Sequence, residues 1–420
     1  MIGIHMNKRE FITSALAINL YGWSNFIFAD EFKFNRERYG YPNYPTWTKR
    51  LNAYQDWQTD SFKVSSYSGG YEKSFPFNMI ENKSIKIELE ESLSNDLKYG
   101  GIFKSNLNDY FLRKPVTSIL IIKNNKLIYE KYGFDRNKNM RLFSWSMAKS
   151  VTGLLLGICI DKNFIESYDD IVSKYVPALT NTYHGSITLR NLSNMSSGAK
   201  IQTPGKSNSD NTYIYRKSLF GFDGISTSIK NVVVEWNEAS QVQGKFFSYN
   251  ELCPLTIGMV IREVTGKSLS EFASEYLWSP LGCTSDATWL TDSTGAEMNC
   301  VGIGATSRDW CKLGMLISNN GVLNGNQILS EKWIKEMTTW SEKDNQVKFG
   351  KANTGLNYNH GYKCFLWHYR RDGSLPCFLG FDGQRVFIDL RNNTVLVHTA
   401  VGSDYEIDYD TELIQIIESL

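Results

Sequence analysis

Histidine and cysteine are sparse in this sequence, and neither is arranged as a metal site. The 420 residues include five histidines and seven cysteines, with no HExxH motif and no CxxC pair. The spacings typical of zinc ligands are therefore missing, and we expect no metal and no other cofactor. Charge of one sign is also lacking: the formal net charge is +1. This balance leaves no electrostatic footprint for nucleic acid or for an anionic membrane surface.

The cysteines are odd in number and scattered along the chain. One of them, Cys159, lies inside a long apolar run. Buried free thiols are one interpretation, and a disulfide between two later cysteines is the alternative if the chain is exported. The full set is Cys159, Cys253, Cys283, Cys300, Cys311, Cys364 and Cys377.

Residues 1–29 are typical of an export signal. Lys8 and Arg9 precede a mostly apolar stretch that ends before Asp30, the order found in secretory signal peptides. Residues 8–12 also resemble a relaxed twin-arginine signal with lysine in place of the first arginine. Three residues interrupt the apolar stretch, Asn19, Gly22 and Asn25, which makes an N-terminal anchor or an amphipathic helix the weaker alternative. We expect a periplasmic or extracellular protein with no stable membrane span after processing.

The rest of the chain divides into an extension and one large domain. Residues 30–110 are rich in aromatic residues, Asn, Ser and Gly, which favours an irregular, surface-wrapping extension. In the domain, 111–420, β-branched runs predict strands at both ends: 116–122 and 126–132 around an Asn-Asn turn, and 385–390 and 394–399 around another.

Helical periodicity fills the middle of the domain. It covers 187–198, 249–266, 268–278, 306–318 and 330–339. Strands at both ends with helices between predict an α/β (α+β) fold. In it an antiparallel sheet is flanked by helices and carries an inserted all-helical subdomain at roughly 165–345.

A serine and a lysine three residues apart, Ser146 and Lys149, stand at the start of the apolar run 151–160. One helical turn separates them, so they share a helix face. Lysine can activate a serine only when its amine is neutral, so we expect burial to lower the Lys149 pKa from about 10.4. The motif alone is weak, because Ser197 and Lys200 match it as well, at a helix end terminated by glycine. A capping serine beside a solvated lysine is the alternative.

The surrounding blocks resemble the serine β-lactamase and penicillin-recognising hydrolase superfamily, most closely its branch with 6-aminohexanoate-dimer hydrolase and class C-related esterases. The resemblance covers roughly 110–405 and implies a serine β-lactamase-like fold. Its blocks, in order, are 126–132, 144–152, 187–198, 244–249 with 258–266, 280–282, and 305–310 with 313–314.

The resemblance implies roles for several residues. Ser146 takes the place of the acylated nucleophile, Lys149 that of its lysine, and Tyr249 that of the tyrosine that passes a proton to the leaving group. Glu251 stands where the family usually has Asn or Ser, and Asn250 is an alternative for that role. A competing match to a Ser-Asp-Asn element, at 209–211, lacks a matching block around it.

The last family element is a strand near the site, here 378–384. It has no lysine, so the positive charge that greets a β-lactam carboxylate is missing. The resemblance implies an oxyanion hole from the backbone N–H groups of Ser146 and Phe381. It also implies substrate contacts from Trp145, Asn250, Glu251, Gly380 and Asp382, of which Asp382 would favour an amine-bearing substrate.

Three functions follow from these residues. The first is a serine hydrolase that cleaves a small-molecule amide or ester through an acyl-enzyme on Ser146. The second is a β-lactamase or penicillin-binding D,D-peptidase, which the missing lysine disfavours. The third is a non-catalytic binding protein on the same fold, for which Glu251 and the missing lysine are the supporting features.

Overall fold

The computed structural model describes residues 72, 76–94, 96–100, 105–134, 136–200, 228–235, 237–339, 361–370, 372–401 and 407–420. The predicted export signal and the Ser-Asp-Asn match at 209–211 lie outside these residues, as does most of the first half of the predicted extension. Export therefore stays a prediction. None of the helices in the described residues is long and apolar enough to cross a membrane.

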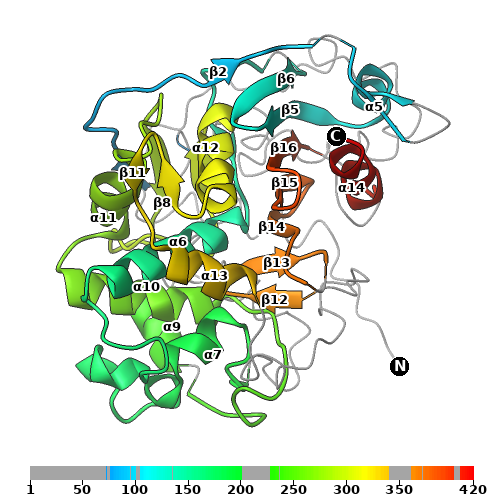
Figure 1. The fold of residues 1–420 in the computed structure, drawn as a ribbon. Coiled ribbons are helices and arrows are strands. Elements are labelled where there is room, and N and C mark those ends of the chain that lie inside the picture. Colours follow the sequence, from blue (N-terminus) through cyan, green and yellow to red (C-terminus); the bar gives the residue numbers. More distant parts are fainter. Residues whose placement is uncertain are drawn as a thin grey trace, which may run out of the picture.

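An eight-stranded sheet forms the centre of the domain (Figure 1). Neighbouring strands are antiparallel except β2, which runs parallel to β6. The predicted strands at both ends of the domain are confirmed, and the β5–β6 turn has positive φ at Asn124 and Asn125 (49° and 66°), which suits a tight hairpin. The strand order is β12 (Gly361–Lys363), β13 (Leu366–His368), β14 (Pro376–Gly380), β15 (Gln384–Asp389), β16 (Thr394–Ala400), β5 (Val116–Lys123), β6 (Lys126–Tyr132) and β2 (Glu90–Glu91).

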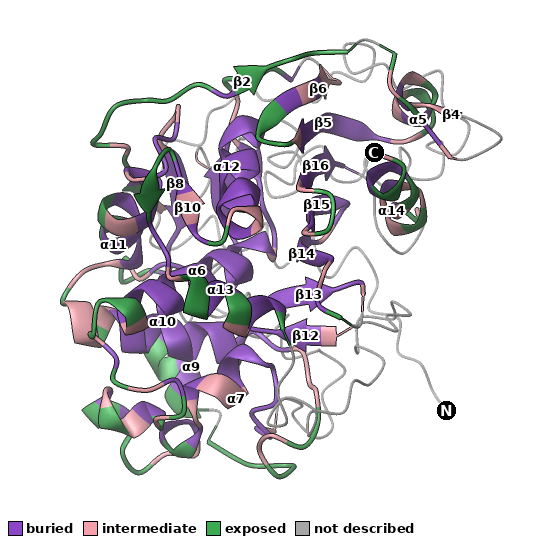
Figure 2. Ribbon diagram, viewed as in Figure 1, coloured by how far each residue is buried: buried purple, intermediate pink, exposed green. Residues whose placement is uncertain are grey.

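Helices cover both faces of this sheet, so its central strands are buried along their length (Figure 2). Helix α12 (Ser307–Ser318) packs on β5, β15 and β16, and α6 (Met147–Asp161) packs on β14. Helix α14 (Asp410–Glu418) packs on β15 and β16 from the other side, near α5 (Leu107–Arg113) (Figure 1). The predicted fold class, an antiparallel sheet flanked by helices, is confirmed.

The helices between the two groups of strands match most of the predicted ranges. Helix α10 (Leu252–Thr265) is capped by Gly266, which has a left-handed φ of 66°. The prediction of a helix over 187–198 is wrong beyond residue 193. Met195 has φ 51°, a left-handed conformation that an α-helix cannot continue through. The helices are α7 (Leu189–Ser193), α9 (Ile229–Glu235), α10 (Leu252–Thr265), α11 (Leu269–Ala273) and α13 (Glu331–Thr338), with 3₁₀ turns at Val172–Lys174, Pro177–Leu179 and His184–Ser186 and a π-turn at Ser274–Trp278.

A second, four-stranded sheet packs against helix α11. Its order is β1 (Phe77–Ile80), β8 (Ala287–Leu290), β9 (Ile303–Ala305) and β7 (Leu142–Phe143). Residues 165–345 therefore contain strands as well as helices. Short pairs complete the fold: β3 (Lys98–Tyr99) with β4 (Ser105–Asn106), and β10 (Val322–Leu323) with β11 (Asn326–Gln327).

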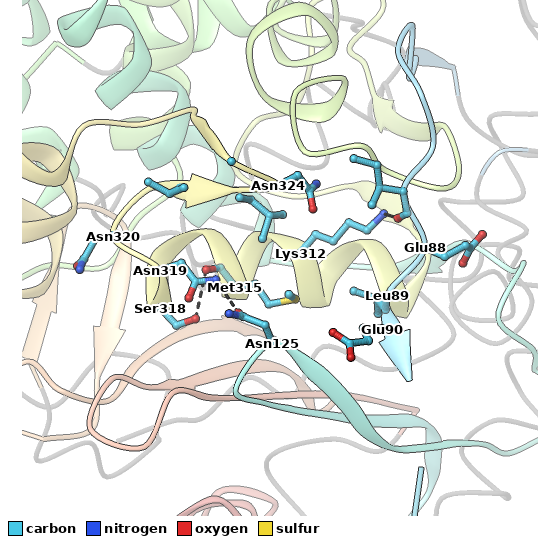
Figure 3. Close-up of a pocket in the computed structure, with 14 residues that line it drawn as sticks. Glu88, Leu89, Glu90, Asn125, Lys312, Met315, Ser318, Asn319, Asn320 and Asn324 are labelled. Atoms are coloured by element: carbon cyan, nitrogen blue, oxygen red, sulfur yellow. Dashed lines mark hydrogen bonds between the residues drawn. The ribbon is translucent and has the colours of Figure 1, made fainter. Parts of the chain in front are cut away.

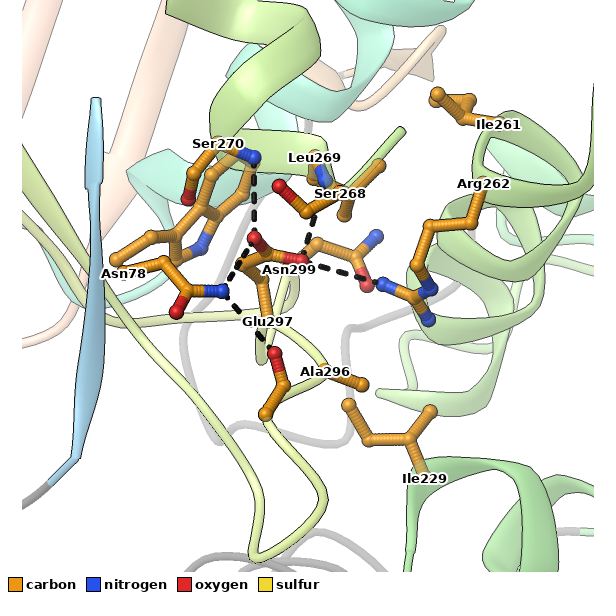
Figure 4. Close-up of polar contacts among 12 residues, drawn as sticks. Asn78, Ile229, Ile261, Arg262, Ser268, Leu269, Ser270, Ala296, Glu297 and Asn299 are labelled. Atoms are coloured by element: carbon orange, nitrogen blue, oxygen red, sulfur yellow. Dashed lines mark hydrogen bonds and ion pairs between the residues drawn. The ribbon is translucent and has the colours of Figure 1, made fainter. Parts of the chain in front are cut away.

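A buried carboxylate, Glu297, ties the N-terminal segment to the helices (Figure 4). It accepts hydrogen bonds from the backbone N–H groups of Leu269 and Ser270 at the start of α11 (3.2 and 3.1 Å). It also accepts from Asn78 of β1 (2.8 Å) and lies 3.6 Å from the Arg262 guanidinium. The charge is thus fully solvated by protein groups, as a buried charge requires.

All seven cysteines are buried and free. Burial raises the pKa of the Cys159 thiol far above its ordinary value, which makes such a thiol inert. The interpretation as buried free thiols therefore describes the structure, and the disulfide alternative does not.

Two buried histidines make the fold sensitive to acid. Burial lowers the pKa of His184 to about 4 and that of His398 to about 3. Between these values and the unfolded pKa of about 6.5, only the unfolded chain binds the proton, so stability falls as pH falls. We expect the free energy of unfolding in urea to drop from pH 7 to pH 5 by roughly 2 kcal/mol per histidine. In the His184→Phe variant the free energy of unfolding should drop by roughly 2 kcal/mol less than in the wild-type protein. An equal drop in both proteins would contradict the lowered pKa of His184.

Candidate active site

The chain reaches Ser146 through a tightly held turn. Strand β7 ends at Phe143, and the Ser144 N–H donates to the Ile303 carbonyl (2.9 Å) while the Ile303 N–H donates to Ser144 Oγ (3.0 Å). Trp145 then adopts φ 47°, a left-handed conformation that is rare for a bulky residue and costs about 1–3 kcal/mol. Ser146 is the N-cap residue of α6. The nucleophile candidate is therefore placed by strand pairing on one side and a buried helix on the other.

The Lys149 ammonium lies against the Ser146 hydroxyl. Lys149 Nζ donates to Ser146 Oγ at 2.9 Å and to the Cys300 carbonyl at 2.9 Å, and the lysine side chain is only 1% exposed. The other Ser-x-x-Lys match has no such geometry, because Lys200 pairs with Glu238 and Ser197 Oγ accepts from the Ala199 N–H. The helix context therefore separates the two matches as expected.

Glu251 pairs with Lys149 inside the protein. Its Oε2 lies 2.6 Å from Lys149 Nζ, and the side chain is 3% exposed. Burial is the largest single influence and lowers the pKa of Lys149, but the charge of Glu251, its hydrogen bond and the nearby Tyr249 and Cys300 together raise that pKa above its ordinary value. The expectation of a desolvated, neutral Lys149 is thus wrong for the resting protein. The physical reason is the carboxylate that stands where the family usually has a neutral side chain.

Tyr249 lies beside the same pair. Lys149 Nζ is 4.9 Å from the centre of the Tyr249 ring, within cation–π range. Burial raises the pKa of Tyr249, and the Lys149 charge and hydrogen bonds with Ser146 and Lys149 act against it. The phenol is therefore protonated at neutral pH and within reach of the serine. The rings of Tyr362 and Trp367 pack against it at 5.8 and 5.5 Å.

Asn250 faces away from this cluster. Its Nδ2 donates to the Ser248 carbonyl (2.8 Å), and its Oδ1 accepts from the Cys253 N–H in the first turn of α10 (2.9 Å). The amide is thus engaged in helix capping. Of the two candidates for the third position of the tyrosine element, the structure brings Glu251 to the lysine and not Asn250.

The end of β14 passes close to the nucleophile turn. A Cβ at Gly380 would lie 2.2 Å from the Ser144 carbonyl oxygen, so only glycine allows this approach. Beyond it, the Phe381 ring packs edge-on against Trp145 at 5.8 Å. Asp382 has φ 60° and is 1% exposed. Ser146 and Phe381, the two proposed oxyanion-hole residues, therefore lie on adjoining segments.

A cavity in the described residues lies away from these side chains. It has a volume of about 620 Å³ and lies between residues 87–90, α12 and the β10–β11 hairpin (Figure 3). Lys312, which lines it, donates to the carbonyls of Ile87 and Gly282 (2.6 Å each). Its ammonium is thus occupied with structural contacts, and none of the predicted site residues lines this cavity. Across the described ranges, no group of His, Cys, Asp and Glu side chains could hold a metal ion.

Three neighbours of the site were not predicted. The Cys300 carbonyl, Tyr362 and Trp367 come from segments distant in sequence and carry no motif. Only the pairing of β13 with β12 and β14 brings the two rings to Tyr249, and no periodicity in the sequence specifies that pairing.

Comparisons with known proteins identify the family of this chain. The family model described as "Beta-lactamase" matches residues 111–413. The 6-aminohexanoate-dimer hydrolase of Paenarthrobacter ureafaciens is 23% identical over 307 residues, which cover 68% of this chain and 73% of that protein. The predicted resemblance to the serine β-lactamase superfamily is confirmed.

Two solved structures are similar over most of their length. One, from Bacillus anthracis and provisionally described as a 6-aminohexanoate-dimer hydrolase, has a TM-score of 0.75 at 25% identity and covers 85% of this chain and 94% of that one. A family VIII carboxylesterase has a TM-score of 0.59 at 17% identity, covering 74% and 94%. The second likeness shows a shared fold.

Substituting Gly380 tests the close approach of β14. Gly380→Ala should shift the end of β14 away from Ser144, because a backbone oxygen blocks the new methyl group. A misplacement of about 1 Å costs roughly 100-fold in rate, so we expect such a loss in p-nitrophenyl ester hydrolysis. Gly266→Ala is the control: it meets no atom within 4 Å but has a strained φ of 66°. Equal activity of the two folded variants would contradict the role of this contact.

Proposed function

The chain belongs to the β-lactamase family, and from this premise we propose that it cleaves an amide or ester bond through an acyl-enzyme on Ser146. The observation that carries the proposal is the 2.9 Å contact between Ser146 Oγ and Lys149 Nζ at the start of a buried helix. A serine needs an adjacent group that can take its proton. Lys149 and Tyr249 are the two candidates beside it.

The proposed reaction has two halves. In the first, Ser146 Oγ attacks the substrate carbonyl carbon and loses its proton to the amine of Lys149. The backbone N–H groups of Ser146 and Phe381 stabilise the developing oxyanion. Tyr249 then donates its phenolic proton to the leaving amine or alcohol and recovers one through Lys149. In the second half, a water molecule attacks the acyl carbon while the Lys149–Tyr249 pair takes one of its protons, and a proton passes to Ser146 Oγ as the acid product is released.

The substrate class follows from similarity and from what the strand at 376–384 lacks. One relative is named a 6-aminohexanoate-dimer hydrolase and one fold neighbour a carboxylesterase, so a small amide or ester is the proposed substrate. No lysine occurs in β14 or the turn after it. A β-lactam carboxylate would therefore lack a cationic partner from this strand.

Ser146→Ala should abolish covalent adduct formation, because the substitution removes the attacking oxygen. We would measure intact mass after incubation with p-nitrophenyl esters, short amino-acid amides and benzylpenicillin. The wild-type protein should gain an acyl mass with esters or amides, and the variant should gain none.

The second Ser-x-x-Lys match supplies the control for this experiment. Ser197→Ala removes the other motif serine and should leave the adduct intact, since Lys200 is engaged with Glu238. A stable adduct with benzylpenicillin alone would instead favour the D,D-peptidase alternative. An adduct of unchanged mass and yield on the Ser146→Ala protein would contradict the assignment of the nucleophile.

Lys149→Met should lower ester hydrolysis by roughly 100-fold or more, the usual contribution of a positioned proton-transfer group. Lys200→Met should not change it, because Lys200 is a surface residue. Thermal melting of both variants would check that they are folded. Equal, measurable turnover of folded Lys149→Met and wild-type protein would contradict the role of Lys149, and no turnover by either protein would favour a non-catalytic scaffold.

A further inference from the structure

We propose that Glu251 acts through Lys149 as the final acceptor of the Ser146 proton, so that the site is a Ser146–Lys149–Glu251 relay. This inference rests on the proposed function and assigns Glu251 a role in proton transfer in place of a substrate contact. Glu251 does not touch the reacting atoms, and it is therefore a positioning residue.

The geometry is a continuous chain of three polar atoms. Ser146 Oγ to Lys149 Nζ is 2.9 Å, and Lys149 Nζ to Glu251 Oε2 is 2.6 Å. Both ionisable side chains are almost fully buried, at 1% and 3% exposure. Bulk water therefore cannot easily take a proton from Lys149, whereas Glu251 is in direct contact with it. The base contacts a carboxylate, as in other nucleophile–base–carboxylate sites; the proposed relay goes further than the serine–histidine–aspartate triad, whose carboxylate does not itself become protonated.

The groups around Glu251 come from several elements and are neutral apart from Lys149. The Cys300 thiol forms a hydrogen bond with the carboxylate, and burial and Glu251 together raise the pKa of that thiol well above its ordinary value. The phenols of Tyr249 and Tyr362 and the Cys253 thiol feel its charge, and the pKa of each is raised, first of all by burial. Lys149 and Glu251 are thus the charged pair of this cluster, and one proton can move between them without changing the net charge.

The proton transfers balance in each step. In the resting state the serine is a hydroxyl, Lys149 an ammonium and Glu251 a carboxylate. Lys149 passes a proton to Glu251, and its amine then takes the Ser146 proton as Oγ bonds to the carbonyl carbon. The tetrahedral oxyanion, the Lys149 ammonium and the neutral Glu251 acid result. When the intermediate collapses, Tyr249 gives its phenolic proton to the leaving group. The proton on Glu251 then returns through Lys149 to the Tyr249 phenolate.

A neutral side chain at position 251 would work differently. Burial alone lowers the pKa of a lysine, so with an uncharged partner the neutral amine of Lys149 would form by slow proton exchange with solvent. With the carboxylate present, the pair keeps its proton and Lys149 can act as a base only by handing that proton to Glu251. The two mechanisms predict different pH dependence, which makes them separable.

The test is the pH profile of kcat/KM for a p-nitrophenyl ester in wild-type, Glu251→Gln and Glu251→Asp proteins. The relay predicts that Glu251→Gln loses roughly 100-fold or more at pH 7. It also predicts a new ascending limb of about tenfold per pH unit as Lys149 loses its proton to solvent. Glu251→Asp keeps a carboxylate and should retain more activity without that limb.

The wild-type profile provides a test that needs no variant. The relay predicts a plateau of kcat/KM from pH 7 through pH 8, because the proton moves inside the Lys149–Glu251 pair and is not lost to solvent. An ascending limb of the wild-type above pH 8, full activity of Glu251→Gln at pH 7, or a Glu251→Gln profile parallel to wild-type would each overturn the relay. A wild-type protein that forms no Ser146 adduct at all would overturn the proposed function as well. The two failures are therefore distinguishable.

Discussion

The buried ion pair between Lys149 and Glu251 is the interaction on which the site depends. Removing two charges from water costs several kcal/mol per ion, and only close contact and further hydrogen bonds offset that cost. Here the ammonium is satisfied by Glu251, Ser146 and the Cys300 carbonyl. Breaking such a pair by removing one partner typically costs about 3–5 kcal/mol. Because the ion pair is costly to bury, its place beside a serine is better explained by a role in proton transfer than by a contribution to stability.

The pair is assembled from segments that the fold brings together from distant parts of the chain. Lys149 comes from α6, Glu251 from the residue before α10, and Cys300 from the loop before β9. Strand β9 also pairs with β7, which delivers the nucleophile turn. One small sheet therefore sets both the position of Ser146 and the carbonyl that holds its lysine. A shift in β9 would disturb both at once.

Much of this fold could be predicted from the sequence because its signals are local. The hairpin at Asn124 and Asn125, the strands beside it and the buried helix after Ser146 depend on patterns within a few residues. The resemblance added Tyr249 beside Ser146 and Lys149. The prediction of a helix past residue 193 was wrong because Met195 adopts a left-handed backbone conformation. The residue type gives no indication of that conformation.

The charge state of Lys149 could not be predicted for a different reason. Its pKa depends on burial and on the carboxylate of Glu251, which is 102 positions later in the chain. Both effects come from tertiary structure and not from residues near Lys149 in the sequence. Sequence reasoning accounted for burial and weighed Glu251 only as a departure from the family pattern. Which of Asn250 and Glu251 turns toward the lysine is decided by the capping of α10, since Asn250 accepts from the Cys253 N–H.

That capping contact links helix formation to chemistry. Asn250 accepts from a backbone N–H in the first turn of α10, and the next side chain, Glu251, contacts Lys149 in the buried cluster. The surrounding aromatic rings of Tyr249, Tyr362 and Trp367 exclude water there, and a low dielectric strengthens every charge interaction among the remaining groups. In such surroundings a proton shared between an amine and a carboxylate moves over a short distance with no change in net charge. An isolated lysine would have to exchange that proton with solvent it cannot easily reach.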